Sequence, residues 1–429
     1  MSVGLPRATL LENLRFNAVA VIPNAVQGMF RRRSTAVAVA TRTEIDGEVV
    51  ALLAAMARKY ERRPVRVRIG RDSAVLLLDP ADVATVLAGA PEPYASDPPA
   101  KRNGMVAFQP DAVTISRGAL WRNRRRFNEA VLRIPRDRKP PRAWLDTCDE
   151  ELDRMLAGPV AAAAALDWDS FEAMLQRVAR RIVLGDGAAG DEALTNLLGE
   201  LMSEANGIPG EAGVEVAELE GMIAHHVERA DRGSLAARFA DAPSDARTNS
   251  VGQVPHWLFA LGDTLAINAF RALAVLGSDA DALAAARGSR AYVGACLQEA
   301  MRLWPTTTVL SRVTTEEVEL GGETLAAGTQ IVISNLFCHR DRDRFEWADD
   351  FVPGEWIDGD ATREPAFNQF GRGPQGCPGR TLAMTVGSEL LGGLIERHTP
   401  ATLPRRLDLK HPLPHMLDFF SIRVRLDPA

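Results

Sequence analysis

The stretch FGRGPQGCPGRTLAM, residues 370–384, sets the strongest limit on how this chain can fold. Gly371, Gly373 and Gly376 match G-x-G-x-x-G, the spacing that opens the helix of a dinucleotide-binding βαβ unit. That unit needs a buried strand before the glycines, yet the preceding residues are REPAFNQF. Pro374, inside the loop, fits such a unit poorly as well. The glycines are therefore not expected to bind a dinucleotide.

Cys377 is the other notable residue of this stretch. Pro378 suits the first position of a helix, so the sequence predicts that Cys377 caps a helix N-terminus. The free N–H groups and the helix dipole at such a position lower the pKa of a thiol and stabilise an anionic sulfur. The upstream glycines let backbone amides fold back towards that sulfur, and Gly379 leaves room for a flat group. The pattern favours a thiolate that ligates a metal from one side over a buried structural cysteine.

The pattern of apolar residues predicts a mainly helical chain with a small β portion. Strands are expected near both ends of the sequence, and no regular alternation of βαβ units is present. Helical periodicity covers residues 45–60 and nearly all of 111–287, whereas strands are predicted at 65–70 and 73–79 (as a hairpin), within 318–334, and in the C-terminal FFSIRVRL.

Charge and cysteine content exclude several classes of protein. A net charge of -6 argues against a surface that binds nucleic acid. The four cysteines include no C-x-x-C pair, so neither a zinc site nor a disulfide framework is indicated. A reducing, cytoplasmic compartment is the simplest expectation.

Residues 1–40 are expected to form an N-terminal segment packed on the body of the protein. Its most apolar part, residues 16–30, is too short to span a bilayer and includes a proline, so no transmembrane anchor is predicted. Because Arg31, Arg32 and Arg33 follow, the alternative is that residues 16–33 touch a membrane surface. Residues 41–429 are expected to fold as a single catalytic domain.

Several motifs together resemble the cytochromes P-450, of the soluble bacterial type. Phe370, Gly371, Gly373, Cys377 and Gly379 form F-G-x-G-x-x-x-C-x-G, which is similar to the haem-thiolate loop of that family. QEAMRLWP at 298–305 resembles its E-x-x-R helix, WRNRRRF at 121–127 its W-x-x-x-R helix, and HWLFALGDTLAINAF at 256–270 the helix over the distal haem face. The resemblance implies a mainly α fold, a triangular helical prism, that holds haem b.

The resemblance implies a monooxygenase that inserts one oxygen atom from O2 into an apolar or moderately polar organic substrate. Electrons would come from a separate partner, a ferredoxin or flavodoxin with its reductase. Cys377 would be the axial ligand of the haem iron, and Asp263 and Thr264 would pass protons to the bound oxygen. Two alternatives stay open: a peroxide-driven peroxygenase of the same fold, which tends to lack this acid–alcohol pair, and a haem-binding sensor or inactive relative.

Further residues acquire expected roles from the same resemblance. Glu299 and Arg302 are expected to form a structural ion pair. The residues expected at the haem are Trp121, Arg125, Arg312, Phe370, Gly371, Gly373, Gln375 and Gly379. Those expected to line the substrate pocket include Leu258, Leu261, Thr307, Val309 and Phe419, together with the loop from Gly104 to Gln109.

The chain also departs from the family's pattern. Gln375 stands where arginine or histidine is usual, and Glu355, in FVPGEW, where an arginine usually joins Glu299 and Arg302. Glu355 is therefore expected either to turn outward, with other donors holding Glu299, or to share Arg302. The remaining arginines of the W-x-x-x-R helix, Arg122, Arg124 and Arg126, are expected to point partly outward and, with Arg372 and Arg380, to form a basic patch for an acidic electron donor. The alternative is that they only form a solvated helix face.

Overall fold

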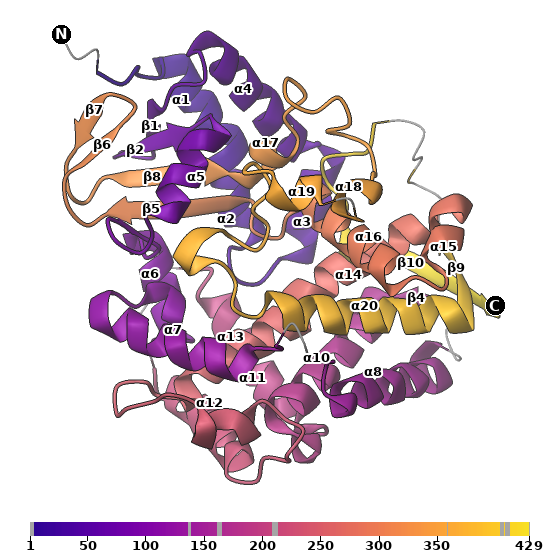
Figure 1. The fold of residues 1–429 in the computed structure, drawn as a ribbon. Helices are drawn as coiled ribbons and strands as arrows, with labels where there is room; N and C mark the ends of the chain where they lie inside the picture. Colours follow the sequence, from indigo (N-terminus) through magenta and orange to yellow (C-terminus); the bar gives the residue numbers. More distant parts are fainter. Residues whose placement is uncertain are drawn as a thin grey trace.

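The computed structural model describes residues 4–135, 139–160, 165–207, 213–357, 359–403, 407 and 412–428. Within them the chain is mainly helical with a small β portion, which confirms the predicted fold class (Figure 1). The α-helices are α1 (Leu10–Phe16), α2 (Ile22–Gln27), α3 (Ser34–Arg42), α4 (Ile45–Lys59), α5 (Pro80–Ala88), α6 (Pro99–Val106), α7 (Gly118–Leu132), α8 (Arg142–Met155), α10 (Trp168–Leu184), α11 (Glu192–Glu204), α12 (Val214–Val227), α13 (Val254–Phe259), α14 (Ala266–Leu276), α15 (Ala280–Ala286), α16 (Arg290–Leu303), α17 (Asn335–His339), α18 (Gly354–Ile357), α19 (Asp360–Arg363) and α20 (Arg380–Arg397).

The strands form three small sheets. The largest has the order β1 (Val65–Ile69), β2 (Asp72–Leu77), β8 (Gln330–Ser334), β5 (Val309–Thr314) and β3 (Tyr94–Ala95). The predicted hairpin is confirmed, since β1 pairs antiparallel with β2, whereas β2 runs parallel to β8. The other sheets are β4 (Leu166–Asp167) with β10 (Arg423–Pro428) and β9 (His398–Leu403), and β6 (Val318–Leu320) with β7 (Glu323–Leu325).

One expected strand begins later than the sequence indicates. Phe419 to Ser421, the first residues of FFSIRVRL, form a 3-10 turn, and β10 starts at Arg423. The reason is local, because the Asp418 carboxylate accepts a hydrogen bond from the Phe420 N–H and so bends the backbone before the strand.

A nearly continuous helical rod crosses the middle of the protein. It consists of a 3-10 turn, α13, a π-helical turn η7 (Ala260–Leu265) and α14. The rod, Val251–Leu276, is the one helix of the described residues that is long and apolar enough to cross a membrane. However, 78% of its apolar window is buried inside the protein, as expected for the central helix of a folded core.

A buried ion pair joins α16 to the segment that follows α17. Arg302 donates to both carboxylate oxygens of Glu299, at 2.8 and 2.6 Å, and both side chains are fully buried. The guanidinium also donates to the carbonyls of His339, Ala348 and Asp350. These bonds tie the long segment between β8 and α18 to the helical body.

The position of Glu355 follows from the other donors to Glu299. The carboxylate accepts from the Val352 N–H at 3.0 Å and from the Trp356 Nε1–H at 2.7 Å. Glu355 is partly exposed and makes no contact with Arg302 among the described hydrogen bonds and ion pairs. Of the two expected arrangements, the protein therefore adopts the one in which other donors hold the pair.

Trp356→Phe should lower the free energy of unfolding, because it leaves a buried carboxylate with one donor fewer. The expected loss is about 1.5–3 kcal/mol, the contribution of a hydrogen bond to a charged group, and the urea midpoint of unfolding measures it. Trp347→Phe is the matched control, since its ring lies 4.9 Å from the Arg302 guanidinium and its phenyl replacement keeps that contact. Equal midpoints in the two variants would contradict the prediction.

Candidate active site

Main-chain hydrogen bonds fix the loop that carries Cys377. The Cys377 N–H donates to the Phe370 carbonyl at 2.7 Å, and the Gly376 N–H donates to the Gly373 carbonyl at 3.0 Å. Gly371 and Gly373 have φ angles of 65° and 67°, in the left-handed region that favours glycine. A Cβ at Gly373 would lie 2.2 Å from the backbone oxygen of Leu87. The glycine is thus required by both conformation and close contact with α5.

Cys377 lies before the helix start and does not cap it. Helix α20 begins at Arg380, with Gly379 as its N-cap residue, so the prediction of a cysteine cap is wrong. The Arg380 N–H instead approaches the Cys377 carbonyl at 3.4 Å, which closes a turn from 377 to 380. Proline is as well suited to the second position of such a turn as to the first position of a helix.

The Cys377 side chain is exposed, whereas Cys148, Cys296 and Cys338 are buried. The surrounding protein nevertheless partly keeps water from the sulfur, and this desolvation raises the pKa of the thiol above its ordinary value. The Gly379 N–H and the Arg125 and Arg380 charges act in the opposite direction. The predicted lowering of the pKa is therefore wrong for the free thiol. A coordinated metal removes the proton outright, so this environment still suits a metal-bound thiolate.

Arginines and aromatic residues surround the cysteine loop. Arg125 Nη1 donates to the Gly376 carbonyl at 2.6 Å. The Arg380 guanidinium lies 5.3 Å from the centroid of the Phe370 ring. Trp121 and Arg125 line one surface groove with Pro374 of the loop. The loop and α7 are thus in contact.

The expected outward direction holds for two of the three arginines of α7. Arg122 and Arg126 are exposed, but Arg124 is buried, forms an ion pair with Asp111 and donates to Ser116 Oγ at 2.9 Å. The prediction that Arg124 points outward is therefore wrong. Residue 124 stands three and four positions before the buried residues 127 and 128, which places all of them on one helix face.

A basic, poorly neutralised region lies at β5 and α6. Arg312 is 5% exposed, and its Nε has no hydrogen-bond partner among the described residues. Burial lowers the pKa of Arg312 to about 10. Burial and the nearby Arg312 charge lower the pKa of Lys101 to about 7, against the opposing charge of Asp97. This region suits an anionic group, and Lys101 is a residue that the sequence analysis did not identify.

Gln375 does not supply the positive charge that an arginine or histidine at this position would bring to the region. Its Nε2 donates to Ser96 Oγ at 3.0 Å, and its Oε1 is buried without a partner among the described residues.

Asp263 and Thr264 lie on the π-helical turn η7 in the central rod. A Cβ at Gly262 would lie 2.4 Å from Gln176 Oε1, so this glycine allows η7 to pack closely on α10. A Cβ at Gly387 would lie 3.0 Å from Leu265 Cδ1, which places the other side of the turn against α20, the helix that follows the cysteine loop.

Asp263 is part of a partly buried group of charges that sequence spacing could not predict. Arg31 pairs with Asp263 at 2.9 Å and with Glu172, on α10, at 3.2 Å. Burial raises the pKa of Asp263. Burial and the Asp263 charge raise the pKa of Glu172 to about 7, although Arg31 opposes both shifts. The arginine comes from the N-terminal segment, far from both carboxyls in sequence.

The N-terminal segment contacts the predicted substrate loop as well. The Phe30 ring lies 5.3 Å from the Phe108 ring, and a Cβ at Gly104 would lie 2.3 Å from Phe30. Phe30 and Arg31 are also hydrogen-bonded to Asn206, just after α11. Outward from these contacts, several large apolar side chains are exposed: Leu10, Leu11, Leu14, Ile22, Val26, Met29 and Val39.

The expected substrate-pocket residues occupy different environments. Leu258, Leu261 and Phe419 are buried in the helical core. Val309 is partly buried at the start of β5, and Thr307 is exposed.

Comparison with known proteins places one third of the chain in a family. The model of the cytochrome P-450 family matches residues 273–412. This range includes Glu299, Arg312 and the whole cysteine loop, but not Trp121 or the Asp263–Thr264 pair.

Individual relatives match over a similar stretch. Ecdysone 20-monooxygenase of Drosophila melanogaster is 38% identical over 111 residues, which cover 24% of this chain and 20% of the relative. Cyclooctat-9-en-7-ol 5-monooxygenase of Streptomyces melanosporofaciens is 34% identical over 109 residues, 25% of this chain and 24% of the relative. A 3-beta-hydroxylase of Tanacetum parthenium is 36% identical over 138 residues, 31% and 27% of the two chains. The matched part of this chain thus spans about a quarter of the length of these relatives.

Proposed function

Because the chain belongs to the cytochrome P-450 family, we propose that it is a haem-thiolate monooxygenase in which the Cys377 thiolate would bind the haem iron. The observation that carries this proposal is the cysteine loop itself. An exposed thiol projects from a loop that main-chain hydrogen bonds and two left-handed glycines hold in place. We further propose that residues 41–429 act as one catalytic domain in the cytoplasm, with residues 1–40 packed against it.

The residues around this loop fit haem b. Gly379 leaves the side of the sulfur free, since a Cβ there would stand 4.0 Å from Sγ. Arg312, with its unpartnered Nε, and Lys101 supply cations for the two propionates, to which hydrogen bonds of about 1.5–3 kcal/mol each are expected. Trp121 and Arg125 would contact the haem edge, and Phe370 would shield the sulfur from water. When bound, the haem supplies the activation of O2.

The chain's own part in catalysis is to hold and deliver protons. Asp263 and Glu172 lie beside one another, both partly buried and with raised pKa values, so the pair retains a proton near neutral pH. Arg31 fixes the orientation of both carboxyls. Thr264, the next residue after Asp263, would accept a proton from the carboxyl pair at its Oγ and release its own hydroxyl proton towards the site where O2 reacts. This acid–alcohol arrangement favours the monooxygenase over the peroxygenase.

Electron delivery is proposed at the surface of α7. Arg122 and Arg126 are exposed beside the groove that Trp121, Arg125 and Pro374 line. These arginines would attract an acidic ferredoxin or flavodoxin, which a reductase reduces in turn. The substrate is an apolar or moderately polar organic molecule, bound near Leu261 and Phe419.

Reduction of the holoenzyme under carbon monoxide tests thiolate ligation directly. The wild-type protein should show a strongly red-shifted Soret band, and Cys377→Ala should lose it. Cys296→Ala, which changes a buried cysteine elsewhere on α16, should keep the band. An ordinary haem–carbon monoxide spectrum in the wild type would contradict the proposal and favour the sensor alternative.

Thr264→Ala should uncouple electron use from oxygen insertion, because the variant lacks the hydroxyl that would direct proton transfer. We expect the rate of substrate oxidation to fall by about 10²-fold or more, the range typical for loss of general acid–base assistance, and the share of consumed O2 that is released as hydrogen peroxide to rise. Thr43→Ala, at an exposed position, is the control. Turnover with peroxide alone, and none with an electron-donor pair, would support the peroxygenase instead.

The raised pKa of Glu172 predicts a pH-dependent stability. Its folded pKa of about 7 lies above the ordinary 4.5, so the stabilising contribution of the protonated carboxyl is fully present below pH 4.5 and is lost as pH rises through 7. The free energy of unfolding of Glu172→Gln, measured relative to that of the wild type, should therefore be about 1–3 kcal/mol higher at pH 8 than at pH 5. Urea midpoints at both pH values measure this, with Glu200→Gln on the exposed face of α11 as control. A pH-independent difference would refute the shift.

A further inference from the structure

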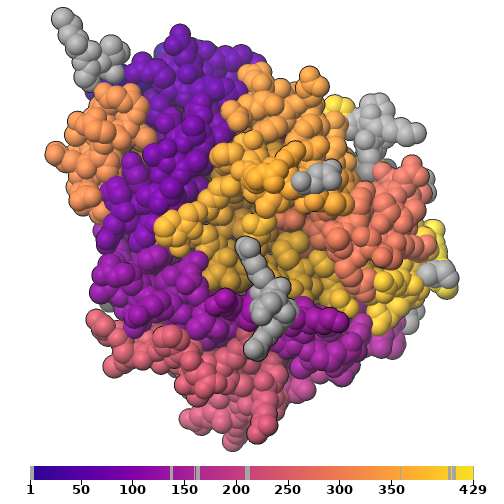
Figure 2. Space-filling model, viewed as in Figure 1, coloured from indigo at the N-terminus to yellow at the C-terminus, as the bar shows by residue number. Residues whose placement is uncertain are grey.

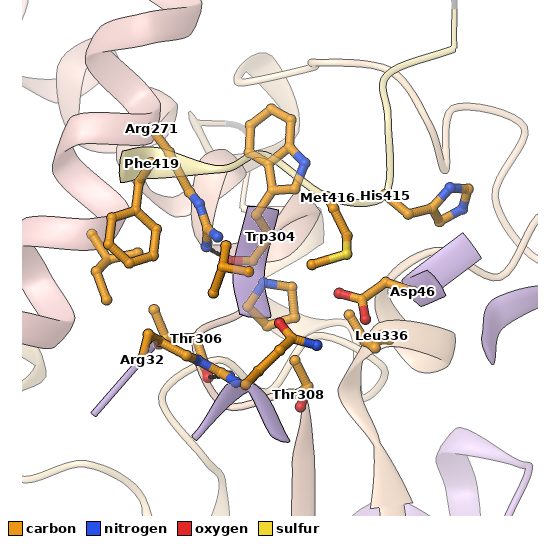
Figure 3. Close-up of a pocket in the computed structure, with 14 residues that line it drawn as sticks. Arg32, Asp46, Arg271, Trp304, Thr306, Thr308, Leu336, His415, Met416 and Phe419 are labelled. Atoms are coloured by element: carbon orange, nitrogen blue, oxygen red, sulfur yellow. Dashed lines mark hydrogen bonds between the residues drawn. The ribbon is translucent and has the colours of Figure 1, made fainter. Parts of the chain in front are cut away.

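A small cavity lies between the N-terminal segment, the central rod and the C-terminal turn (Figure 3). Its wall includes Arg32, Asp46 of α4, Arg271 of α14, Trp304, Thr306 and Met416. Its volume of about 30 Å³ is enough for roughly two or three water molecules, or for one carboxylate group. The figure shows the side chains of Arg32, Arg271 and Asp46 gathered around the same space.

Two guanidinium groups line this cavity without an ion pair. Arg32 Nη2 donates to the Thr306 carbonyl at 2.9 Å. Arg271 donates from Nε to the Leu417 carbonyl at 3.1 Å and from Nη1 to the Trp304 carbonyl at 2.9 Å. In the part of the chain that the structure describes, these are the hydrogen bonds of the two guanidiniums, and no carboxylate pairs with either. Their backbone bonds fix their direction and leave their charge uncompensated by close contact.

Asp46 and Asp418 lie near these arginines without forming ion pairs with them, and Asp46, with a pKa of about 6, is largely ionised at pH 7. Burial and the Arg32 charge lower the pKa of Arg271 to about 9, although Asp46 and Asp418 act in the opposite direction. Burial raises the pKa of Asp46 to about 6 despite both arginines. Burial lowers the pKa of His415, also in the wall, to about 4, so this imidazole is neutral at pH 7. Both guanidiniums are partly buried, so a carboxylate that contacts them directly would add charge-assisted hydrogen bonds.

The cavity lies in line with the proposed oxygen site. Ile267 and Arg271 are three and seven positions after Thr264, hence on the same face of the central rod. The opposite wall includes Thr306 and Phe419, from the two segments that the family resemblance assigns to the substrate pocket. A molecule held by one end at Arg271 could therefore extend along the rod towards Thr264.

We propose that the cavity between Arg32 and Arg271 binds the carboxylate of an organic acid, and that the substrate is such an acid with its apolar part directed towards Thr264. The two guanidiniums supply charge-assisted hydrogen bonds, and Ile267, Met416 and Phe419 form the apolar part of the wall around the carboxylate end of the acid. The assignment of this acid as substrate rests on the proposed monooxygenase function, whereas the binding of a carboxylate does not.

Acetate is the first probe, because it is a carboxylate that fits the cavity without any assumption about the rest of the substrate. Sodium acetate, at about 20 mM and with ionic strength held constant by sodium chloride, should raise the thermal midpoint of the wild-type holoenzyme by a few degrees. Arg271→Met and Arg32→Met should each abolish this shift. Arg42→Met, which removes an exposed arginine at the end of α3, should leave it unchanged.

A second experiment distinguishes a site for the carboxylate of a substrate from a site for a free small anion. Decanoic acid and phenylpropionic acid are titrated against their methyl esters, with the haem spin state and calorimetry as readouts. Each acid should bind about tenfold or more tightly than its ester, and Arg271→Met should remove that preference. Acetate binding together with equal affinities for acids and esters would show a site for a free small anion and would overturn the substrate assignment.

Two results would overturn the cavity as an anion site. One is the absence of any acetate effect on the wild type, and the other is an effect of equal size in both arginine variants. If Arg271→Met does not fold, as its thermal midpoint without acetate would show, Arg32→Met and the wild type still decide the question. The carbon monoxide spectrum of the same samples tests thiolate ligation separately, so failure of the carboxylate site and failure of the haem proposal are distinguishable.

Discussion

The buried pair of Glu299 and Arg302 is the interaction on which the arrangement of the site depends. Arg302 binds the carbonyls of His339, Ala348 and Asp350, and Glu299 binds Val352 and Trp356. A long segment with little regular structure is thereby fixed to α16, and the cysteine loop follows that segment in the chain. Removing either partner would leave a buried charge, at a cost of about 3–5 kcal/mol.

The N-terminal segment contributes to the interior of the proposed site as well as covering it. Arg31 holds Asp263 and Glu172, the neighbouring Arg32 lines the anion cavity, and Phe30 packs on Phe108. Figure 2 shows how closely the parts of the chain pack on the face in view. The proposed proton donors and the proposed substrate carboxylate would therefore be organised by adjacent residues of one short segment.

Sequence patterns were reliable where a local physical rule acts alone. The β1–β2 hairpin and the helices that begin at Ile45 and Pro80 follow from periodicity, turn residues and the Asp79 cap. Predictions from sequence patterns failed where two local rules compete. Pro378 suits both a turn and a helix start, and the turn prevailed. Arg124 was expected outside because it flanks the residues assigned to the haem, but its position on the helix places it beside buried residues, where Asp111 neutralises it.

The sequence by itself indicated the resemblance to the cytochromes P-450, the mainly helical fold and Cys377 as the candidate haem ligand, because each depends on residues close together in the chain. Only the tertiary structure decided which charges meet. The contacts of Arg31 with Glu172 and Asp263, the two guanidiniums of the anion cavity, and the donors that replace an arginine at Glu299 all join residues far apart in sequence. Electrostatic interactions depend on distance and burial in space, and neither quantity is fixed by spacing along the chain.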